Sequence, residues 1–433
     1  GEGMCGIVGI LGGDFSPDTR ESLCRNIMSR LAHRGPDDAG LLTFPDSKLV
    51  LGHRRLSIID TSRAGHQPMV SRDGRWVLVF NGEIYNAKSL ASKWGLTDRL
   101  QGSSDSEVLC ELVAELGPER AAQSAVGMFA FGAWDNHEEI LYVVRDRLGI
   151  KPLYLACAAG TIAFSSELRA LRCIPGLVGD ISQAGLASLL RFGYVMGPST
   201  IYDRVEKVMP GTIVSIRANG PSSQIQRKVW WSVEGLCHQP LLDIDDREAI
   251  ELVRDSIEQS VADRMITDRP LGAFLSGGVD SSLVVSMMAR QSSIPIQTFS
   301  IGFDDKAYDE AVGAKSVAQH LGTDHTEFYV GEQDALDVVP QLGHMFDEPF
   351  ADSSQIPTAI LCSITRNSVV VSLSGDGGDE LFGGYDRYAW TMRLWNRLSR
   401  VPYSVRCLAA TTLNSLPNVV LQRIGSAANA CAP

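Results

Sequence analysis

Two stretches of this 433-residue chain carry residues whose types and spacing could do chemistry. The first is Met4-Cys5-Gly6-Ile7. A thiol at the start of a chain can use its own α-amine as the base, because that amine has an ordinary pKa of about 8. The second is Ser276-Gly277-Gly278-Val279-Asp280-Ser281-Ser282, whose glycines and hydroxyls suit a loop that holds polyphosphate. The chain therefore offers one nucleophile and, far from it in sequence, one candidate nucleotide site.

The bulk composition narrows the class of partner. The formal net charge is −12 and no long Lys/Arg run occurs, which disfavours nucleic acid and favours small molecules. Nine cysteines without a CxxC pair predict neither a disulfide framework nor a zinc site, and they fit a reducing compartment. No apolar stretch reaches the length of a membrane span, and the N-terminus lacks a signal-peptide pattern. We expect a soluble, cytoplasmic protein without a membrane partner.

The elements that must position Cys5 are short β-rich runs separated by turn residues, which predict stacked antiparallel sheets. These runs are Cys5–Leu11, Leu49–Leu51, Trp76–Phe80, Met128–Trp134, Ile140–Val144 and Leu153–Cys157. Apolar residues at helical spacing in Pro17–Leu31 and Ser106–Leu116 predict helices that cover the sheets. The sequence thus predicts an α+β domain over residues 5–200, followed by a connecting region over 201–245. Turn residues in that region occupy Met209–Gly211 and Ala218–Gln226.

The second half alternates helices and strands, which predicts a doubly wound parallel sheet over residues 246–433. The predicted helices are Asp246–Thr267, Ser281–Ala289, Asp309–Leu321 and Pro357–Arg366, and the predicted strands are Pro270–Leu275, Ile296–Ile301 and Ser368–Leu373. Ligand loops are expected at the carboxyl ends of these strands.

Four motifs follow Cys5 in order: His33–Asp38, Arg54–Ile58, Asn81–Asn86 and Ser104–Glu107. Together with Cys5 they resemble the class II glutamine amidotransferases, the N-terminal-nucleophile family, over roughly residues 5–200. The residue types fit free glutamine. Arg55 suits its α-carboxylate and Asp105 its α-ammonium. Asn81 through its side-chain NH, and Gly82 through its backbone NH, could stabilise the tetrahedral oxyanion.

The resemblance implies that Cys5 is the nucleophile and that Asn81 and Gly82 serve the oxyanion. It implies glutamine contacts from Arg55, Leu56, Ser57, Ile58, Ile59, Asn81, Gly82, Glu83 and Asp105. Each residue also has a plainer interpretation. Arg55 could be a surface ion-pair partner, Asp105 a helix N-cap, and Asn81-Gly82 a hairpin turn. His33–Asp37 is interpreted as scaffold that shapes the site.

The residues Gly1–Met4 that precede Cys5 depart from the family pattern. An amidated Cys5 nitrogen cannot act as a general base. If translation begins at Met4, removal of this methionine would expose the Cys5 amine, and we expect glutaminase activity to be lost where the leader persists.

The candidate nucleotide loop follows the apolar run Leu271–Leu275 and opens a helix, which places backbone NH groups and a helix N-terminus at one point. It lacks the lysine of the GxxxxGK[ST] loop and resembles the pyrophosphatase-type loop of enzymes that split ATP into AMP and pyrophosphate. A second glycine-rich loop, Ser374–Tyr385, follows the apolar run Val369–Leu373. Its acids offer oxygen ligands for Mg²⁺, and we assign Asp280 and Asp379 to the metal.

The two loops resemble the asparagine synthetase family, as do Thr298–Phe303 and Asp347–Asp352. The resemblance implies ATP contacts from Phe274, Ser276, Gly277, Gly278, Asp280, Ser281, Ser282, Ile301, Ser374, Gly375 and Asp376. Phe274 stands where an aliphatic residue is usual, and Asp376 stands where some members have glutamate. The family's acceptor pocket and catalytic lysine lie further along, so we expect the synthetase domain to be incomplete at Pro433.

The implied activity is a ligase that makes asparagine. Aspartate and MgATP would give β-aspartyl-AMP, and ammonia from glutamine would be released through a thioester at Cys5. Family members are often homodimers. One alternative is the same architecture acting on another carboxylate, such as a sugar acid in surface polysaccharide synthesis. A second alternative is a β-lactam-forming relative, which needs no ammonia and would not retain Cys5, Arg55, Asn81 and Asp105 together. A third is a non-catalytic protein that binds glutamine and ATP.

Overall fold

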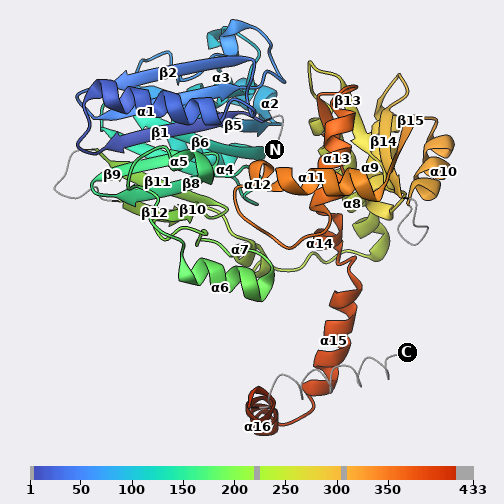
Figure 1. Cartoon of the computed structure of the whole chain (residues 1–433). Helices are drawn as coiled ribbons and strands as arrows, with labels where there is room; N and C mark the ends of the chain where they lie inside the picture. Colours follow the sequence, from blue (N-terminus) through green and yellow to red (C-terminus); the bar gives the residue numbers. More distant parts are fainter. Residues whose placement is uncertain (1–3, 219–224, 304–309, 416–433) are drawn as a thin grey trace. The chain divides into compact units, whose positions relative to one another are not determined.

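A computed structural model describes residues 4–218, 225–303 and 310–415 of the chain (Figure 1). The chain divides into two compact units, residues 1–374 and 375–433, which are described separately. The first unit holds two antiparallel sheets and one parallel sheet.

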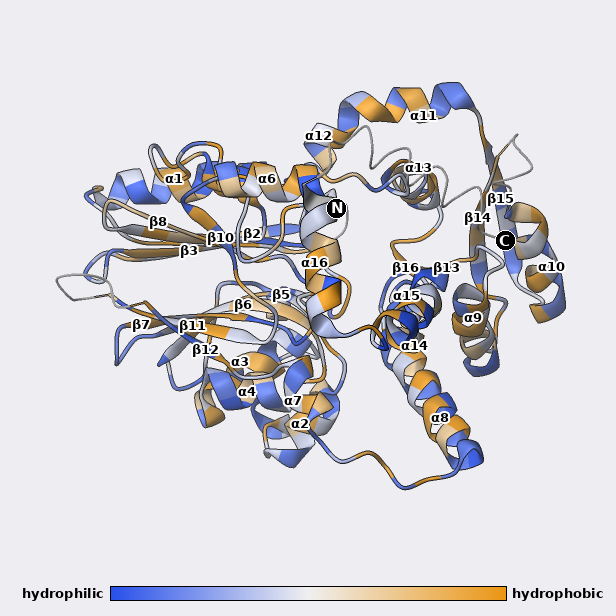
Figure 2. Ribbon diagram, turned by 90° about the horizontal axis from the view of Figure 1, so that it is seen from below, coloured by the Kyte–Doolittle hydropathy of each residue, from blue (hydrophilic) through white to orange (hydrophobic). Residues whose placement is uncertain are grey.

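The two antiparallel sheets each have six strands. The first has the order β10 (Val205–Lys207), β8 (Tyr154–Ala158), β9 (Thr161–Ser165), β1 (Gly6–Gly12), β3 (Leu49–Arg55) and β2 (Asp38–Phe44). The second has the order β12 (Ile225–Val229), β11 (Thr212–Arg217), β7 (Ile140–Arg145), β6 (Gly127–Asp135), β5 (Trp76–Ile84) and β4 (Met69–Val70). Figure 2 shows them as two stacked layers.

Side-chain alternation along each strand explains the stacking. Ile7 of β1 packs with Val79 of the other sheet in the apolar layer between the sheets. Its neighbour Val8 points to the opposite face and packs with Ile27 of helix α1 (Pro17–Arg30). Helices α2 (Ala87–Lys93), α3 (Asp105–Leu116) and α4 (Pro118–Ser124) contribute to the apolar cluster on the outer face of the second sheet. The predicted α+β domain of stacked antiparallel sheets is confirmed.

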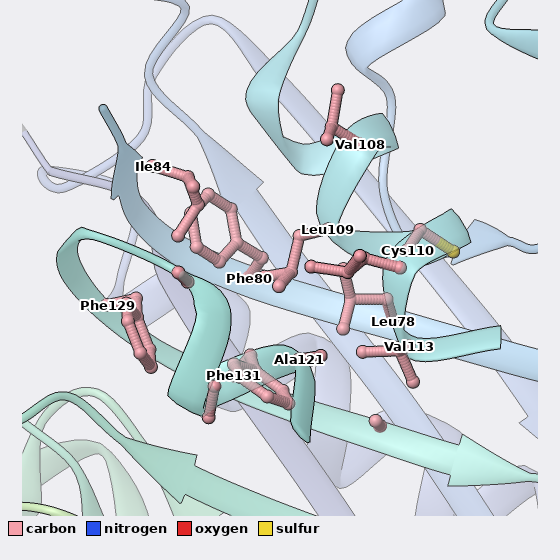
Figure 3. Close-up of a cluster of buried hydrophobic side chains, with 14 of the residues drawn as sticks. Leu78, Phe80, Ile84, Val108, Leu109, Cys110, Val113, Ala121, Phe129 and Phe131 are labelled. Carbon is pink, nitrogen blue, oxygen red and sulfur yellow. The ribbon is translucent and has the colours of Figure 1, made fainter. Parts of the chain in front are cut away.

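Helix α3 is fixed against strand β5 by a buried cluster that Figure 3 shows. Val108, Leu109 and Val113 of α3 lie in one cluster with Leu78 and Phe80 of β5, all fully or nearly buried. This packing brings the start of α3 to the end of β5. The backbone NH of Ile84 on β5 donates to Asp105 Oδ2 at the start of α3 over 2.8 Å.

The parallel sheet has the strand order β15 (Asp324–Val330), β14 (Gln297–Phe303), β13 (Leu271–Phe274) and β16 (Val371–Leu373). All three of its strand pairs are parallel. Helices α8 (Asp246–Arg264), α9 (Val279–Gln291) and α10 (Ala311–Leu321) supply Val261, Val285 and Ala314 to its core. Helix α13 (Gln355–Thr365) also contacts β14. The predicted α/β domain on a parallel sheet is confirmed.

Seven strands had no counterpart in the prediction from sequence. Strands β10, β11 and β12 extend the two antiparallel sheets into residues 205–229, part of the predicted connecting region. The others are β2, β4, β9 and the polar edge strand β15. Of the predicted turn Ala218–Gln226, residues 219–224 lie outside the described residues, and β12 begins at Ile225.

Several short helices complete the first unit. They are α5 (Leu168–Leu171), α6 (Gln183–Phe192), α7 (Val233–Cys237), α11 (Glu332–Val338) and α12 (Leu342–Met345). The second unit contains α14 (Gly378–Phe382), α15 (Asp386–Leu398) and α16 (Tyr403–Asn414). No helix in the described part of the chain has the length and apolar character needed to cross a membrane.

Candidate active sites

Cys5 lies at the entrance to strand β1 and lines a pocket with residues from several distant segments. The lining residues are Met4, Cys5, Arg55, Leu56, Ile58, Ile59, Gln67, Phe80, Asn81, Gly82, Glu83, Asp105, Ser106 and Lys151. The structure thus brings together the sequence-predicted glutaminase residues with one exception. Ser57 is buried but does not line the pocket, and its backbone NH donates to Asp37 Oδ2 over 2.8 Å.

The Cys5 thiol is held by the backbone of the pocket wall. Its Sγ accepts from the Leu56 NH at 3.4 Å and lies 3.6 Å from the Leu56 carbonyl oxygen. Burial raises the pKa of this thiol, and the Leu56 hydrogen bond only partly opposes that effect. The thiol therefore needs a base beside it before it can attack a substrate.

Asn81 offers a free donor in the same pocket. It is 1% exposed, and its Nδ2 has no hydrogen-bond partner among the residues that the structure describes. A buried amide NH without an acceptor destabilises the fold unless a ligand accepts its hydrogen bond. A developing oxyanion next to Cys5 would be such an acceptor.

Gly82 follows Asn81 inside strand β5, where the two pair with Phe129 and Ala130 of β6. The plainer interpretation of Asn81-Gly82 as a hairpin turn is therefore wrong. A Cβ added at Gly82 would clash with the backbone oxygen of Met128, so close strand pairing requires glycine at this position.

Arg55 is buried rather than a surface residue, with 6% exposure. Its Nη1 donates to the Ser62 carbonyl over 2.7 Å, and its Nη2 donates to the Asp60 carbonyl. It forms no ion pair with any other described residue. Because a guanidinium carries five N–H groups, three remain for a carboxylate in the pocket.

Asp105 stands at the start of α3, but the N-cap of that helix is Ser104, whose hydroxyl accepts from the Glu107 NH. The N-cap interpretation of Asp105 is therefore wrong. Burial raises the pKa of Asp105 to about 7, and the charge of Glu83 adds to this effect although the Ile84 NH opposes it. A cation placed beside this carboxyl would favour its ionised form.

Lys151 is a pocket residue that the sequence analysis missed. It is 6% exposed, and its Nζ lies 3.2 Å from the Met4 sulfur. Burial lowers the pKa of this amine, and the charge of Glu83 opposes the effect. The loop before it is closed by Asp146, whose carboxylate accepts from the Leu148, Ile150 and Lys151 backbone NH groups at 3.0 Å each. An aspartate followed by Gly149 between two strands was the signal available in the sequence.

Gln67 and Arg34 make contacts at the pocket that the sequence did not predict. Gln67 lines the pocket and accepts from the Phe80 NH at 2.6 Å through its Oε1. Arg34 Nε donates to the Cys5 carbonyl oxygen over 3.1 Å, which is consistent with a scaffold role for His33–Asp37.

The candidate nucleotide loop joins β13 to α9, as expected from the sequence. Ser276 and Ser281 close it, with their hydroxyl oxygens 3.0 Å apart, and the Gly278 NH donates to Ser276 Oγ over 3.2 Å. Gly277 has a φ of 80°, a conformation that favours glycine. Asp280 lies in the first turn of α9. The Ser282 hydroxyl is buried without a partner in the described portion of the chain.

Gly277, Gly278 and Ser282 also line a pocket with residues of α10, among them Ser316 and His320. Phe274, Ser276, Asp280, Ser281 and Ile301 are not among its lining residues.

Neighbouring parallel strands bring further sequence-predicted residues to the same sheet edge. Phe274 ends β13, and Ile301 lies on β14 two residues beyond Phe299, the partner of Phe274. Ser374 directly follows β16, which pairs with β13 in parallel. The carboxyl ends of these strands therefore share one edge, where ligand loops of such sheets lie.

Gly375, Asp376 and Asp379 belong to the second unit. Gly377 has a φ of 94° and precedes α14. The Gly384 NH donates to the Asp379 carbonyl oxygen over 3.0 Å. Among the described residues, no three His, Cys, Asp or Glu side chains converge as a metal site.

A sandwich of two antiparallel sheets between helices, with a cysteine directly before its first strand, is the fold of the N-terminal-nucleophile amidotransferases. The glutamine amidotransferase domain family matches residues 4–231, and the asparagine synthase family matches residues 252–432.

Curated proteins similar to this chain are also described as asparagine synthetases. Asparagine synthetase 1 (glutamine-hydrolysing) of Bacillus subtilis is 35% identical over 408 residues, covering 93% of this chain and 62% of the relative. A Methanocaldococcus jannaschii protein provisionally described as asparagine synthetase 2 (glutamine-hydrolysing) is 33% identical over 401 residues, covering 88% of this chain and 76% of that protein. The chain belongs to the family of glutamine-hydrolysing asparagine synthetases. It spans somewhat less than two thirds of the length of the Bacillus subtilis relative.

Proposed function

We propose that this chain takes part in the ATP-dependent synthesis of asparagine from aspartate, with glutamine as the source of ammonia. One observation carries the glutamine half of the proposal. The buried Asn81 amide, whose Nδ2 has no partner in the described part of the chain, lies in one pocket with the Cys5 thiol, the Arg55 guanidinium and the Asp105 carboxyl. These groups complement the reacting amide, the α-carboxylate and the α-ammonium of free glutamine.

In the first reaction, the free α-amine of Cys5 takes the thiol proton, and the thiolate attacks the amide carbon of glutamine. Asn81 Nδ2 and the Gly82 NH stabilise the oxyanion. The protonated amine then gives its proton to the leaving nitrogen, so ammonia departs and a thioester remains at Cys5. Water hydrolyses the thioester to glutamate, which restores the thiol. Arg55 and Asp105 hold the substrate, with Leu56, Ile58, Ile59 and Glu83 as the surrounding wall.

In the second reaction, the β-carboxylate of aspartate attacks the α-phosphorus of MgATP, which gives β-aspartyl-AMP and releases pyrophosphate. Ammonia then attacks the acyl carbon, and AMP leaves as asparagine forms. We assign pyrophosphate to the Ser276–Ser282 loop, whose backbone NH groups and helix N-terminus attract anions. Asp280 and Asp379 would hold the magnesium of MgATP. Phe274, Ile301, Ser374, Gly375 and Asp376 would contact the nucleotide.

The test is product analysis by mass spectrometry with amide-¹⁵N glutamine, aspartate and MgATP, using full-length protein with Cys5 verified as its first residue. The proposal expects labelled asparagine together with AMP and pyrophosphate in equal amounts. Labelled ammonia and glutamate without asparagine would overturn the assignment of aspartate and point to another carboxylate, such as a sugar acid. Binding of glutamine and ATP without turnover of either would instead favour a non-catalytic regulatory protein.

A further inference from the structure

The Asp347–Asp352 motif places its two leading acids against the amidotransferase part of the first unit. Asp347 accepts from the backbone NH groups of Leu168 at 2.7 Å and Arg169 at 3.1 Å. Glu348 accepts from the Ile201 NH at 2.6 Å and lies 2.7 Å from Lys207 Nζ. Their side chains are 12% and 11% exposed. Both acids therefore make half-buried docking contacts between the two halves of this unit.

Among the described residues, contacts lead onward to Cys5 from Asp347 and not from Glu348. Its Oδ1 lies 3.8 Å from Arg169 Nε, which in turn donates to Glu167 Oε2 over 3.0 Å. Glu167 Oε1 accepts from Arg34 Nη1 at 3.3 Å. Arg34 Nε donates to the backbone carbonyl of Cys5 over 3.1 Å. Acid and base alternate along this chain of four side chains, which we call the Asp347 relay.

The inner two groups of the relay, Glu167 and Arg34, are buried, while Asp347 and Arg169 are half-buried. Burial and the charge of Glu167 raise the pKa of Asp347 to about 6, so this carboxyl is ionised at pH 8. Although burial of Glu167 opposes ionisation, the His33 hydrogen bond and the charges of His33, Arg34 and Arg169 lower its pKa to about 2. Arg34 is 3% exposed, and its Nη2 has no acceptor among the described residues. The position of the Arg34 guanidinium therefore depends on Glu167 and on the Cys5 carbonyl. A shift of Glu167 would move the backbone of the nucleophile.

We infer that Asp347 is a positioning residue for Cys5, acting through Arg169, Glu167 and Arg34. Glu348 docks the same loop but lies off the relay. This inference rests on the proposed function, in that it takes Cys5 as the nucleophile of glutamine hydrolysis. Small displacements of a reacting group reduce turnover strongly, while substrate contacts made by Arg55 and Asp105 stay in place.

The test compares Asp347→Asn with Glu348→Gln in the full chain with Cys5 verified as the first residue. Both substitutions remove one half-buried carboxylate charge from the same loop. We expect Asp347→Asn to lower the glutaminase kcat about tenfold while the KM for glutamine stays within about twofold. We expect Glu348→Gln to leave both constants within about twofold of the parent protein.

Glu167→Gln gives a second comparison. If the relay operates, Asp347→Asn added to Glu167→Gln lowers kcat no further, because both substitutions interrupt one connection. Thermal melting of every variant separates a change in position from loss of the fold. Equal losses in the Asp347 and Glu348 variants would overturn the inference and leave a docking contact only. An unchanged kcat in Asp347→Asn would also overturn it.

Alkylation of Cys5 by iodoacetamide, followed on the peptide that contains it, needs no glutamine turnover. The relay expects the alkylation rate to change by at least about threefold in Asp347→Asn and by less than about twofold in Glu348→Gln. Equal alkylation rates in the two variants would contradict the inference, whether or not the parent protein hydrolyses glutamine. A parent protein that hydrolyses no glutamine would contradict the proposed function instead.

Discussion

Substitution of Asp105 by asparagine tests the charge that we assign to the glutamine ammonium. The change keeps the shape of a side chain that is 8% exposed and packs at the start of α3. The Ile84 NH donates to Asp105 Oδ2 over 2.8 Å, and an asparagine oxygen can accept the same bond. The substitution therefore removes a charge with little loss of structure.

The expected magnitude follows from the burial of this carboxyl. A hydrogen bond to a charged group contributes about 1.5–3 kcal/mol, which corresponds to a factor of about 10–150 in kcat/KM. The ammonium is remote from the reacting amide, so the loss should fall mainly on KM. At pH 8 the wild-type carboxyl is largely ionised, because burial raises its pKa only to about 7.

The same pKa predicts how the effect changes with pH. Below pH 7 the free enzyme increasingly holds a neutral Asp105, which attracts the ammonium no better than asparagine does. The ratio of wild-type to variant kcat/KM should therefore shrink about tenfold for each pH unit below 7, until the two proteins converge. The α-amine of Cys5 titrates in both proteins, so its contribution cancels in this ratio.

The assay is glutamate formation at several glutamine concentrations from pH 5.5 to 8.5. The matched control is Glu111→Gln, because Glu111 lies on the same helix, is also 8% exposed, accepts from the Arg72 NH at 2.8 Å and lies outside the pocket. A wild-type to Asp105→Asn ratio that does not vary with pH would refute the reasoning. An equal loss in Glu111→Gln would refute it as well, because the effect would then come from the helix.

Other expectations concern both sites. Asn81→Ala should lower the glutaminase kcat about 10²–10³-fold with little change in KM, measured by steady-state glutamate release, because an oxyanion donor is lost. Gly82→Ala should lower the thermal midpoint by several degrees, measured by calorimetry, because its Cβ would clash with strand β6. Asp280→Asn should lower pyrophosphate release at least about tenfold and leave glutamine hydrolysis unchanged, measured with separate assays of the two products. Protein that retains Met4, verified by intact mass, should form no glutamate, because the Cys5 nitrogen is then an amide.

The sequence predicted best those elements whose pattern is local. The alternation in β1 and the helical spacing of α1 and α3 were readable, because each face of these elements meets one apolar layer. The edge strand β15 was not, since its exposed and half-buried residues carry little alternation. Strand β10 has only three residues and β12 is mostly polar, so neither gives a clear strand signal. The buried strand β11 lies between the predicted turns Met209–Gly211 and Ala218–Gln226 and was interpreted as part of the connection.

Some residues of the Cys5 pocket were likewise predicted from the sequence and others were not. Asn81, Gly82 and Asp105 were identified from residue type and motif, and the structure places them around Cys5. Lys151 was missed because its place in the pocket depends on a loop that Asp146 closes through backbone hydrogen bonds. Such bonds leave no periodic signal in the sequence.

The wall of the Cys5 pocket also makes hydrogen bonds to the second half of the first unit. The Asp268 NH donates to the Ile58 carbonyl over 3.0 Å, and Asp268 Oδ2 accepts from the Asp60 NH at 2.9 Å. Arg269 Nε donates to the Ser57 carbonyl over 2.8 Å. These two residues lie just before Pro270 and strand β13, which leads into the Ser276–Ser282 loop. One wall of the pocket is thus hydrogen-bonded to the segment that enters β13, and the opposite end of that strand leads into the Ser276–Ser282 loop.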